Sequence, residues 1–332
     1  MKFLFCKEKK SPTGKKVAII GAGPSGLTVA GEMICNGHEV HVFDSLPEPG
    51  GLLIFGIPEW RIPKEPIKKG IEELKSAGVK FHLNHKVDDE EFSEILESYD
   101  AVFVGTGAWE PISMGLEGED LEGVYQAMDY LFKVAMVREG YSKEEEIPNL
   151  GERVAVIGCG DVAMDACRTA KRRGAKEVFV IYRRSRKEAP ATEMELQDAE
   201  KEGIEFMWLT NPTKFIGRKR VEKMELIKMK LGEPDSSGRP RPEPIPGSEF
   251  EMDVDSVILA IGQRPTPPFK GDFGIKVEWG RIVTDEEGRT TRKGVFAGGD
   301  VSLGPRKIGD AISTGKKAAR AMEMYLSDGY WP

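Results

Sequence analysis

The feature that most constrains this chain is a glycine-rich turn set between an apolar strand and a helix near its start. Residues 17–20 form a short apolar run, which is typical of a strand buried on both faces. Apolar residues recur at helical spacing after the turn, and a second apolar strand over 40–43 ends on Asp44. The turn matches the pattern G-x-G-x-x-G through Gly21, Gly23 and Gly26, with Pro24 and Ser25 between the last two. The stretch 16–44 therefore predicts a strand–turn–helix–strand unit that binds a dinucleotide.

Each glycine of this turn has a physical role. The first allows the tight turn, the second lets the backbone approach a pyrophosphate, and the third lets the helix pack closely against the strand. The pyrophosphate is expected at the free N–H groups and the positive dipole end of the helix. Asp44 can accept hydrogen bonds from an adenosine ribose. The alternative is a glycine-rich turn that serves packing only.

The chain repeats this unit in its middle. Residues 153–160, RVAVIGCG, correspond to residues 16–23, KVAIIGAG. Ala163 stands where the first unit has its third glycine, a substitution that the pattern allows. Two such units in register predict two dinucleotide-binding domains.

The two units differ where their second strand ends. The first has Asp44, whereas the second has Tyr182, followed by a basic run: Arg183, Arg184, Ser185, Arg186 and Lys187. A carboxylate there would bind a ribose 2′-hydroxyl and repel a 2′-phosphate, while arginines accommodate the phosphate. This difference predicts NADP at the second unit, with Arg183 and Arg184 at the phosphate. The alternative is a solvated basic run.

Composition limits the classes of protein to consider. A chain of 332 residues suggests two domains at about 150 residues each. Its net charge of −7 argues against general nucleic-acid binding. The basic N-terminus lacks the apolar run of a secretory signal, and no apolar stretch is long enough for a membrane span. We therefore expect a soluble, cytoplasmic protein without a membrane partner.

The cysteines and histidines predict no metal site. The four cysteines, Cys6, Cys35, Cys159 and Cys167, form no C-x-x-C motif. This excludes a C-x-x-C dithiol, a zinc ribbon and an iron–sulfur cluster held by this chain alone. We expect most of them to be small buried apolar side chains, with Cys6 as the exposed exception. His82 and His85 lie in an expected strand, where a spacing of three places them on opposite faces.

The remaining elements follow from periodicity and from glycine and proline. Residues 1–15 are expected to be a polar lead-in, and the glycine- and proline-rich segment 46–64 an irregular functional loop. We expect helices at 65–78, 90–98, 191–202 and 309–325. We expect a strand at 79–83, buried strands at 101–104 and 257–261, and a strand running into a turn over 294–300. We also expect antiparallel strands over 204–231, a proline-rich hairpin tip over 232–247, and a short strand with turns over 281–295.

This constellation resembles the two-dinucleotide-fold flavoproteins of the disulfide reductase superfamily, and most closely the small (beta) chains of NADPH-dependent glutamate synthase. The resemblance rests on PGGLLIFGIPEWRIPK at 49–64, GCGDVAMDACRTAKRRGA at 158–175, YRRSRKEAPA at 182–191, ILAIGQRP at 258–265 and FAGGD at 296–300. Those chains usually begin with a cysteine-rich domain that holds two 4Fe–4S clusters, which is missing here. Glutamate synthesis by this chain alone is therefore not expected.

The resemblance implies an α/β fold with an FAD domain over 1–108 and 266–332, interrupted by an NADP domain over 109–265. The residues that it implies for FAD are Gly21, Gly23, Pro24, Ser25, Gly26, Asp44, Gly51, Leu52, Ile57, Arg61, Thr106, Gly107, Gly299, Asp300, Ile308 and Ala311. Those implied for NADP are Gly158, Gly160, Asp161, Val162, Ala163, Arg183 and Arg184, and Gly262 is a further cofactor-binding candidate.

The resemblance also implies a reaction. Hydride would pass from NADPH to FAD, and electrons would leave one at a time to an iron–sulfur protein or a large-type glutamate synthase subunit. The cofactors supply this chemistry, so we name no proton-transfer residue. Two alternatives remain open: a free-standing NADPH reductase of quinones, dyes or ferredoxin, and a catalytically silent FAD-binding subunit.

Overall fold

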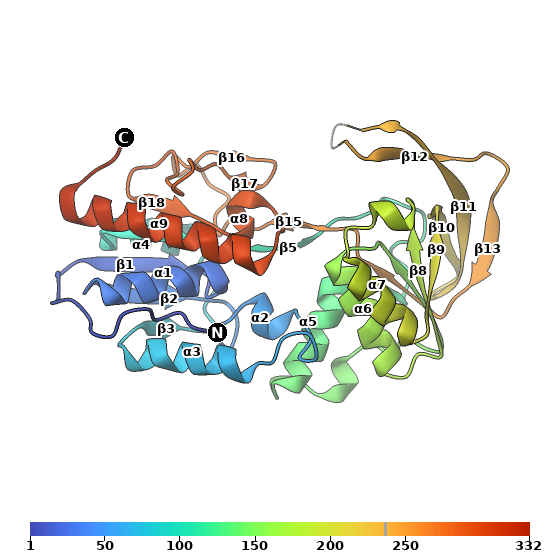
Figure 1. Cartoon of the computed structure of the whole chain (residues 1–332), viewed down its shortest axis with the longest axis horizontal. Helices are drawn as coiled ribbons and strands as arrows, with labels where there is room; N and C mark the ends of the chain where they lie inside the picture. The colour runs from blue at the N-terminus through green and yellow to red at the C-terminus, as the bar shows by residue number, and fades with distance from the viewer. Residues whose placement is uncertain (236–237) are drawn as a thin grey trace. The chain divides into compact units, whose positions relative to one another are not determined.

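The chain folds into two compact units, of which the second interrupts the first in sequence (Figure 1). The computed structural model describes residues 1–235 and 238–332. The first unit comprises Met1–Glu110 and Gln263–Pro332, and the second comprises Pro111–Gly262. These limits fall within a few residues of those expected from the sequence. The assignment of one cofactor to each unit stays a prediction.

The first unit is built on a parallel sheet of five strands in the order β18-β4-β1-β2-β3. Its strands are β1 (Lys16–Ile20), β2 (Glu39–Phe43), β3 (Lys80–His82), β4 (Ala101–Val104) and β18 (Val295–Ala297). Both β4 and β18 are buried along their whole length, as strands covered on both faces should be. The last strand comes from the C-terminal part of the chain, so the sheet is completed by segments far apart in sequence.

Helices cover this sheet, and glycine sets how closely two of them approach. The helices of this unit are α1 (Pro24–Cys35), α2 (Leu52–Phe55), α3 (Glu65–Ser76), α4 (Asp89–Ser98), α8 (Asp300–Leu303) and α9 (Ile308–Asp328), of which α1, α4 and α9 contact the sheet directly. A Cβ atom on Gly315 of α9 would lie 2.7 Å from the Ser25 carbonyl oxygen of α1, so only glycine permits this packing. The helices expected at 65–78, 90–98 and 309–325 are confirmed. The loop at 46–64 was expected to hold no helix, and this is wrong for α2.

The second unit repeats the first in its topology. Its parallel sheet has the order β6-β14-β7-β8-β9. The strands are β6 (Val124–Gln126), β7 (Arg153–Ile157), β8 (Glu177–Tyr182), β9 (Ile204–Trp208) and β14 (Ser256–Leu259), and the helices are α5 (Ala127–Arg138), α6 (Asp161–Arg172) and α7 (Glu193–Lys201). Strands β7, β8 and β9 occupy the places that β1, β2 and β3 occupy in the first unit. The internal sequence repeat is therefore a repeat of structure.

An antiparallel layer lies beside this sheet in the second unit. It consists of β10 (Thr210–Gly217), β11 (Val221–Pro234), β12 (Pro240–Pro244) and β13 (Phe250–Asp253). The antiparallel strands expected over 204–231 are confirmed except for β9, which pairs with β8 in parallel. The expected tip over 232–247 is shorter, because β11 continues to Pro234 and β12 begins at Pro240. Residues 236–237 of that expected tip lie outside the described residues.

Short elements complete both units. They are β5 (Ala108–Pro111) with β15 (Gln263–Pro265), β16 (Val277–Glu278) with β17 (Arg281–Ile282), and the single turns η1 (Glu144–Glu146) and η2 (Arg186–Glu188). Within residues 1–235 and 238–332, no helix has both the length and the apolar character that a bilayer crossing requires.

The histidine pair departs from the sequence prediction. Strand β3 ends at His82, and Asn84 adopts a left-handed conformation with φ of 51°, which turns the chain back. The rings of His82 and His85 consequently approach to 6.5 Å between centroids, so they do not point to opposite faces. Among the residues that the structure describes, no group of three or more His, Cys, Asp or Glu side chains is arranged to hold a metal ion.

The N-terminal segment is not the polar lead-in that the sequence suggested. Phe3 is fully buried. A Cβ atom on Gly31 of α1 would lie 1.9 Å from the Phe3 carbonyl oxygen, and one on Gly70 of α3 would lie 2.2 Å from the Met1 carbonyl oxygen. These two glycines let the N-terminal segment pack directly against α1 and α3, which explains why an apolar side chain so near the terminus belongs to the core.

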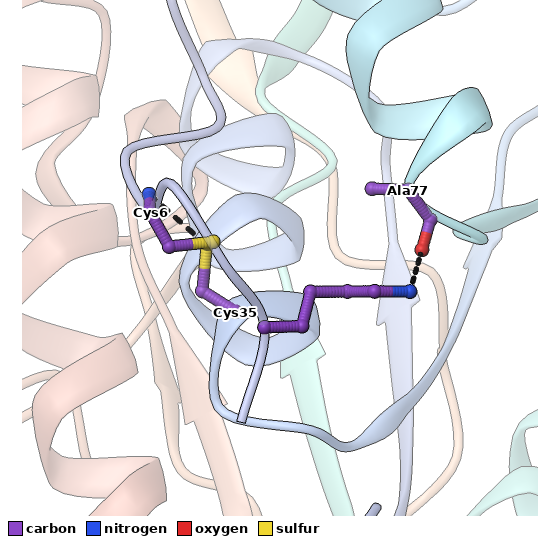
Figure 2. The surroundings of a disulfide bond; sticks show 4 residues. Cys6, Cys35 and Ala77 are labelled. Carbon is purple, nitrogen blue, oxygen red and sulfur yellow. Dashed lines mark hydrogen bonds between the residues drawn. A yellow bond between two sulfur atoms is a disulfide. The ribbon is translucent and has the colours of Figure 1, made fainter. Parts of the chain in front are cut away.

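A disulfide between Cys6 and Cys35 fixes this segment to the last residue of α1 (Figure 2). Lys9 adds a hydrogen bond from its Nζ to the Ala77 carbonyl oxygen at 2.7 Å. The expectation of a buried side chain is confirmed for Cys35, but it did not include the bond to Cys6, which is partly buried rather than exposed. The same expectation is confirmed for Cys159 and Cys167, which are free and buried.

We predict that replacing both bonded cysteines, Cys6→Ser with Cys35→Ser, destabilises the first unit. The disulfide closes a separation of 29 residues, and losing such a link costs about 3 kcal/mol, or roughly 10 °C in Tm. The measurement is thermal unfolding with and without a thiol reductant. The reductant should lower the Tm of the parent protein and leave that of the double variant unchanged. Four titratable thiols in the denatured, unreduced parent would contradict the bond.

Candidate functional site

The first glycine turn is held by contacts between backbone atoms. Gly21 has φ of 102°, and its N–H donates to the Phe43 carbonyl oxygen at 2.8 Å. A Cβ atom on Gly21 would lie 2.4 Å from the Gly105 carbonyl oxygen, and one on Gly26 would lie 2.0 Å from the Gly21 carbonyl oxygen. Neither position has room for a side chain, so packing alone requires both glycines.

Gly23 differs from its two neighbours in the turn. Its φ of −74° suits any residue, and the nearest heavy atom to a Cβ atom there is the Gly105 carbonyl oxygen at 4.0 Å. Gly23 is also the N-cap of α1 and has no side chain with which to cap the first N–H groups of that helix. The chain therefore leaves open space at the helix N-terminus, which fits the pyrophosphate of a dinucleotide.

Asp44 joins this turn to the end of β2. Its Oδ2 accepts a hydrogen bond from the Ala22 N–H at 2.6 Å, and its Oδ1 accepts one from the Leu46 N–H at 2.8 Å. Burial raises the pKa of this carboxyl above its usual value, against the two backbone hydrogen bonds. A carboxylate has about four acceptor sites, so Asp44 keeps capacity to accept from ribose hydroxyls.

The loop after β2 lies against the same turn. The Gly50 N–H donates to the Ala22 carbonyl oxygen at 2.8 Å, and a Cβ atom on Gly51 would lie 2.9 Å from Cα of Gly23. Leu52 begins α2, and Ile57 and Arg61 follow it in the same loop. Gly51 is thus brought to the turn by a direct contact.

Sequence reasoning missed the residue that fixes this loop. The side chain of Lys64 is buried, and its Nζ donates to the carbonyl oxygens of Leu53 and Ile57, at 2.7 Å each. A buried ammonium must be satisfied by acceptors, and the loop carbonyls supply them. The signal in the sequence is a single lysine at the end of a segment that is otherwise mostly apolar, which is weak.

Gly299, the second glycine of the FAGGD segment, contributes to the first site from the C-terminal part of the chain. Gly299 has φ of 73°, and a Cβ atom there would lie 2.8 Å from the Ser25 hydroxyl oxygen. Asp300 follows at the start of α8, and burial raises its pKa to about 6 although the Arg306 N–H donates to its Oδ1 at 3.1 Å. Ala311 lies beside Gly299, whereas Ile308 is the first residue of α9.

Thr106 and Gly107 connect the two chain segments of the first unit. The Thr106 hydroxyl donates to the Thr266 carbonyl oxygen at 2.6 Å, and the Thr266 N–H donates to the Gly107 carbonyl oxygen at 3.0 Å. These contacts occupy one polar atom of each residue with the returning chain. They give both residues a structural role in addition to the one that the sequence predicts.

The second turn has the same backbone geometry as the first. Gly158 has φ of 119°, donates to the Ile181 carbonyl oxygen at 3.0 Å, and has no room for a Cβ atom, which would lie 2.3 Å from the Ala260 carbonyl oxygen. Gly160 has open space, with Cβ of Pro190 at 3.9 Å. Asp161 and Val162 begin α6, Ala163 is fully buried, and Gly262 follows β14 with φ of 124°.

The basic run after β8 is not one uniform surface. Arg184 is buried, and its Nη2 lies 2.7 Å from Oδ2 of Asp235. Arg186 is paired with Glu193 and Glu200. Arg183 and Lys187 are exposed. The two arginines predicted for the phosphate therefore lie in different surroundings, and the alternative of a solvated run is wrong for Arg184.

We predict that Gly23→Ala and Gly26→Ala have different consequences. A methyl group on Gly23 enters the open space, so FAD binding should weaken by about 1–3 kcal/mol while the apoprotein keeps its stability. A methyl group on Gly26 meets backbone, so the apoprotein itself should lose about 1–3 kcal/mol. Fluorescence titration with FAD and thermal unfolding of both apoproteins distinguish the two effects. Equal loss of stability in both variants would contradict the assignment of the space to a ligand.

The sequence relatives of the chain are oxidoreductase subunits. The chain is 42% identical over 325 residues to the glutamate synthase (NADPH) small chain of Halomonas elongata, with 95% of this chain and 68% of that protein covered. It is 43% identical over 324 residues to the NADP(+)-dependent formate dehydrogenase subunit beta of Moorella thermoacetica, with 96% of this chain and 45% of that protein covered. The chain thus spans between about half and two thirds of the length of these curated relatives.

Solved structures share the fold. FprA from Mycobacterium tuberculosis matches with a TM-score of 0.80 at 22% identity, covering 95% of this chain and 85% of that one. Thioredoxin reductase from Lactococcus lactis matches with a TM-score of 0.68 at 23% identity, covering 94% and 99%. These similarities confirm the predicted α/β fold of two Rossmann-like domains.

The family match covers nearly the whole chain. Residues 15–315 match the family described as pyridine nucleotide-disulphide oxidoreductase. The match confirms, at the level of the family, the predicted oxidoreductase class and the predicted cofactors FAD and NADP. The chain belongs to the pyridine nucleotide-disulphide oxidoreductases, and within them it is similar to the glutamate synthase small chains that its motifs resemble.

Proposed function

We propose that the chain transfers hydride from NADPH, held by the second unit, to FAD, held by the first, and passes the electrons singly to an iron–sulfur partner. The observation that carries this proposal is the pair of matching glycine turns with unlike strand ends. Both turns leave space at the second glycine, and one is followed by Asp44 and the other by Tyr182 and Arg183. A cytoplasmic location, expected from the sequence, is part of the proposal.

The residues of the first unit support FAD there. Asp44 would accept the adenosine ribose hydroxyls, the N-terminus of α1 would face the pyrophosphate, and Asp300 would accept a ribityl hydroxyl. Gly51 and Gly299 contact the turn from opposite ends of the chain. When bound, FAD supplies the hydride-accepting chemistry, and these side chains bind and orient it.

The names of the relatives support a partner that accepts electrons. Besides the glutamate synthase small chains, the chain is 37% identical over 353 residues to the NADPH-Fe(3+) oxidoreductase subunit beta of Geobacter sulfurreducens. Each of these relatives is named as a chain or subunit of a larger enzyme. We therefore propose an iron–sulfur protein, or a large-type glutamate synthase subunit, as the partner.

We predict that the isolated chain purifies with one FAD and without stoichiometric iron, and that NADPH bleaches its flavin absorbance in the absence of oxygen. Reduced protein should then reduce a ferredoxin-type protein faster than a quinone. The measurements are metal analysis, anaerobic titration and stopped-flow absorbance. A flavin that NADPH leaves oxidised would favour a silent FAD-binding subunit, and faster quinone reduction would favour a free-standing reductase.

We also predict a pH dependence of FAD binding that Asp300 causes. Burial raises the pKa of this carboxyl from 3.8 to about 6 in the free protein. A ribityl hydroxyl that donates to the carboxylate favours the ionised form. FAD affinity should therefore rise with pH up to about 6, by at most tenfold per pH unit, and level off above it. Titrating the apoprotein with FAD between about pH 5 and 8 measures this.

Matched variants separate Asp300 from its neighbour Asp310. Asp300→Asn should remove the pH dependence, whereas Asp310→Asn should only move its midpoint lower, because it removes a nearby negative charge. The same raised pKa stabilises the protonated fold, so the apoprotein should lose stability as pH rises from 3.8 toward about 6. An unchanged pH profile in Asp300→Asn would remove Asp300 from the flavin site.

A further inference from the structure

We infer that Asp235, on the β11–β12 hairpin, limits the preference of the second unit for NADPH by holding Arg184 away from the 2′-phosphate. Arg183 is then the arginine that contacts the phosphate, and Arg184 is a positioning residue. This inference rests on the proposed binding of NADPH to the second unit.

Arg184 is held by hydrogen bonds through both its guanidinium and its backbone. Its Nη2 donates to Oδ2 of Asp235 at 2.7 Å, and its Nε donates to the Pro240 carbonyl oxygen at 2.8 Å. The backbone carbonyl oxygen of Arg184 accepts a hydrogen bond from the Leu209 N–H at 3.0 Å. Only 4% of the Arg184 side chain is exposed, against 23% for Asp235. The guanidinium is therefore buried against Asp235 and Pro240, while the backbone of Arg184 is fixed beside the residue that follows β9.

The hairpin is shaped to present these acceptors. Asp235 directly follows β11, and Pro240 is the first residue of β12. The Asp235 N–H donates to the Arg239 carbonyl oxygen at 2.8 Å, and the Gly238 N–H donates to the Asp235 carbonyl oxygen at 2.9 Å. These bonds hold Asp235 beside Gly238 and Arg239, and the carboxylate and the Pro240 carbonyl oxygen both accept from Arg184.

The negative charge of Asp235 opposes a contact between Arg184 and the 2′-phosphate. Turning the guanidinium toward a phosphate would leave the Asp235 carboxylate without this cation, which is costly for a half-buried charge. The carboxylate would also repel a phosphate that approaches the same guanidinium. A bound 2′-phosphate thus competes with Asp235 for Arg184 and gains little from it.

Arg183 has none of these restraints. It is exposed, and across residues 1–235 and 238–332 no ion pair engages it. Arg186 is unsuited to the phosphate for the same reason as Arg184, because Glu193 and Glu200 hold its guanidinium at 2.8 and 2.5 Å. One arginine contact corresponds to a preference of about tenfold, where two would give about a hundredfold.

The test measures binding of 2′,5′-ADP and 5′-ADP to the FAD-loaded protein by calorimetry, because these probes differ only in the 2′-phosphate. Arg183→Ala should weaken binding of 2′,5′-ADP about tenfold and leave 5′-ADP unchanged. Asp235→Asn removes the competing charge and should tighten binding of 2′,5′-ADP several-fold. Asp253→Asn, a matched change at an exposed carboxylate of the same unit, should alter neither.

Arg184→Ala completes the set with a second readout. Arg184→Ala should lower the Tm, because it removes a buried ion pair. It should change the ratio of the 2′,5′-ADP and 5′-ADP affinities much less than Arg183→Ala does. If Arg184→Ala does not fold, Asp235→Asn still decides, because the amide oxygen keeps an acceptor for Arg184. Weaker 2′,5′-ADP binding in Asp235→Asn, or equal losses in both arginine variants, would overturn the inference. Parent protein that binds both probes equally would instead overturn the NADPH assignment itself.

Discussion

The first unit depends on an approach of two backbones that leaves no room for a side chain. At Gly21 the chain turns against the Gly105 carbonyl oxygen, and at Gly26 helix α1 begins directly over the same turn. This contact brings the ends of β1 and β4 together with the N-terminus of α1. The open space at Gly23 exists because the glycines on either side let the backbone close around it. The proposed ligand contacts of Asp44, Gly51 and Gly299 all converge on this arrangement.

The second unit has the same close approach of two backbones, but different side chains follow it. Gly158 meets Ala260 as Gly21 meets Gly105, so the turn is conserved between the two halves of one chain. The side chains that follow it are not. Asp44 hydrogen-bonds back to its own turn, whereas Tyr182 donates to the Glu188 carbonyl oxygen at 2.9 Å and opens the basic run. The backbone therefore fixes where a dinucleotide can lie, and the residue after the second strand adjusts which one.

Sequence patterns over a few residues predicted the elements that short-range interactions form. The turns, the parallel strands and most helices follow from periodicity and glycine spacing, because those features act over a few residues. Phe3, the Cys6–Cys35 disulfide and the Arg184–Asp235 pair each join segments far apart in sequence. No spacing rule reveals such contacts. Arg184 illustrates the limit, since its neighbour Arg183 has the same chemistry and only the hairpin distinguishes their surroundings.

The interrupted first unit has a consequence for how the chain is made. Strand β18 pairs with β4, and α9 packs on α1, so the first unit is incomplete until residues 295–328 have left the ribosome. The second unit, Pro111–Gly262, is continuous and is synthesised before them. We therefore expect the inserted unit to fold first during translation, while the earlier strands wait for their partners. Their exposed edges in that interval are where protection against aggregation is needed most.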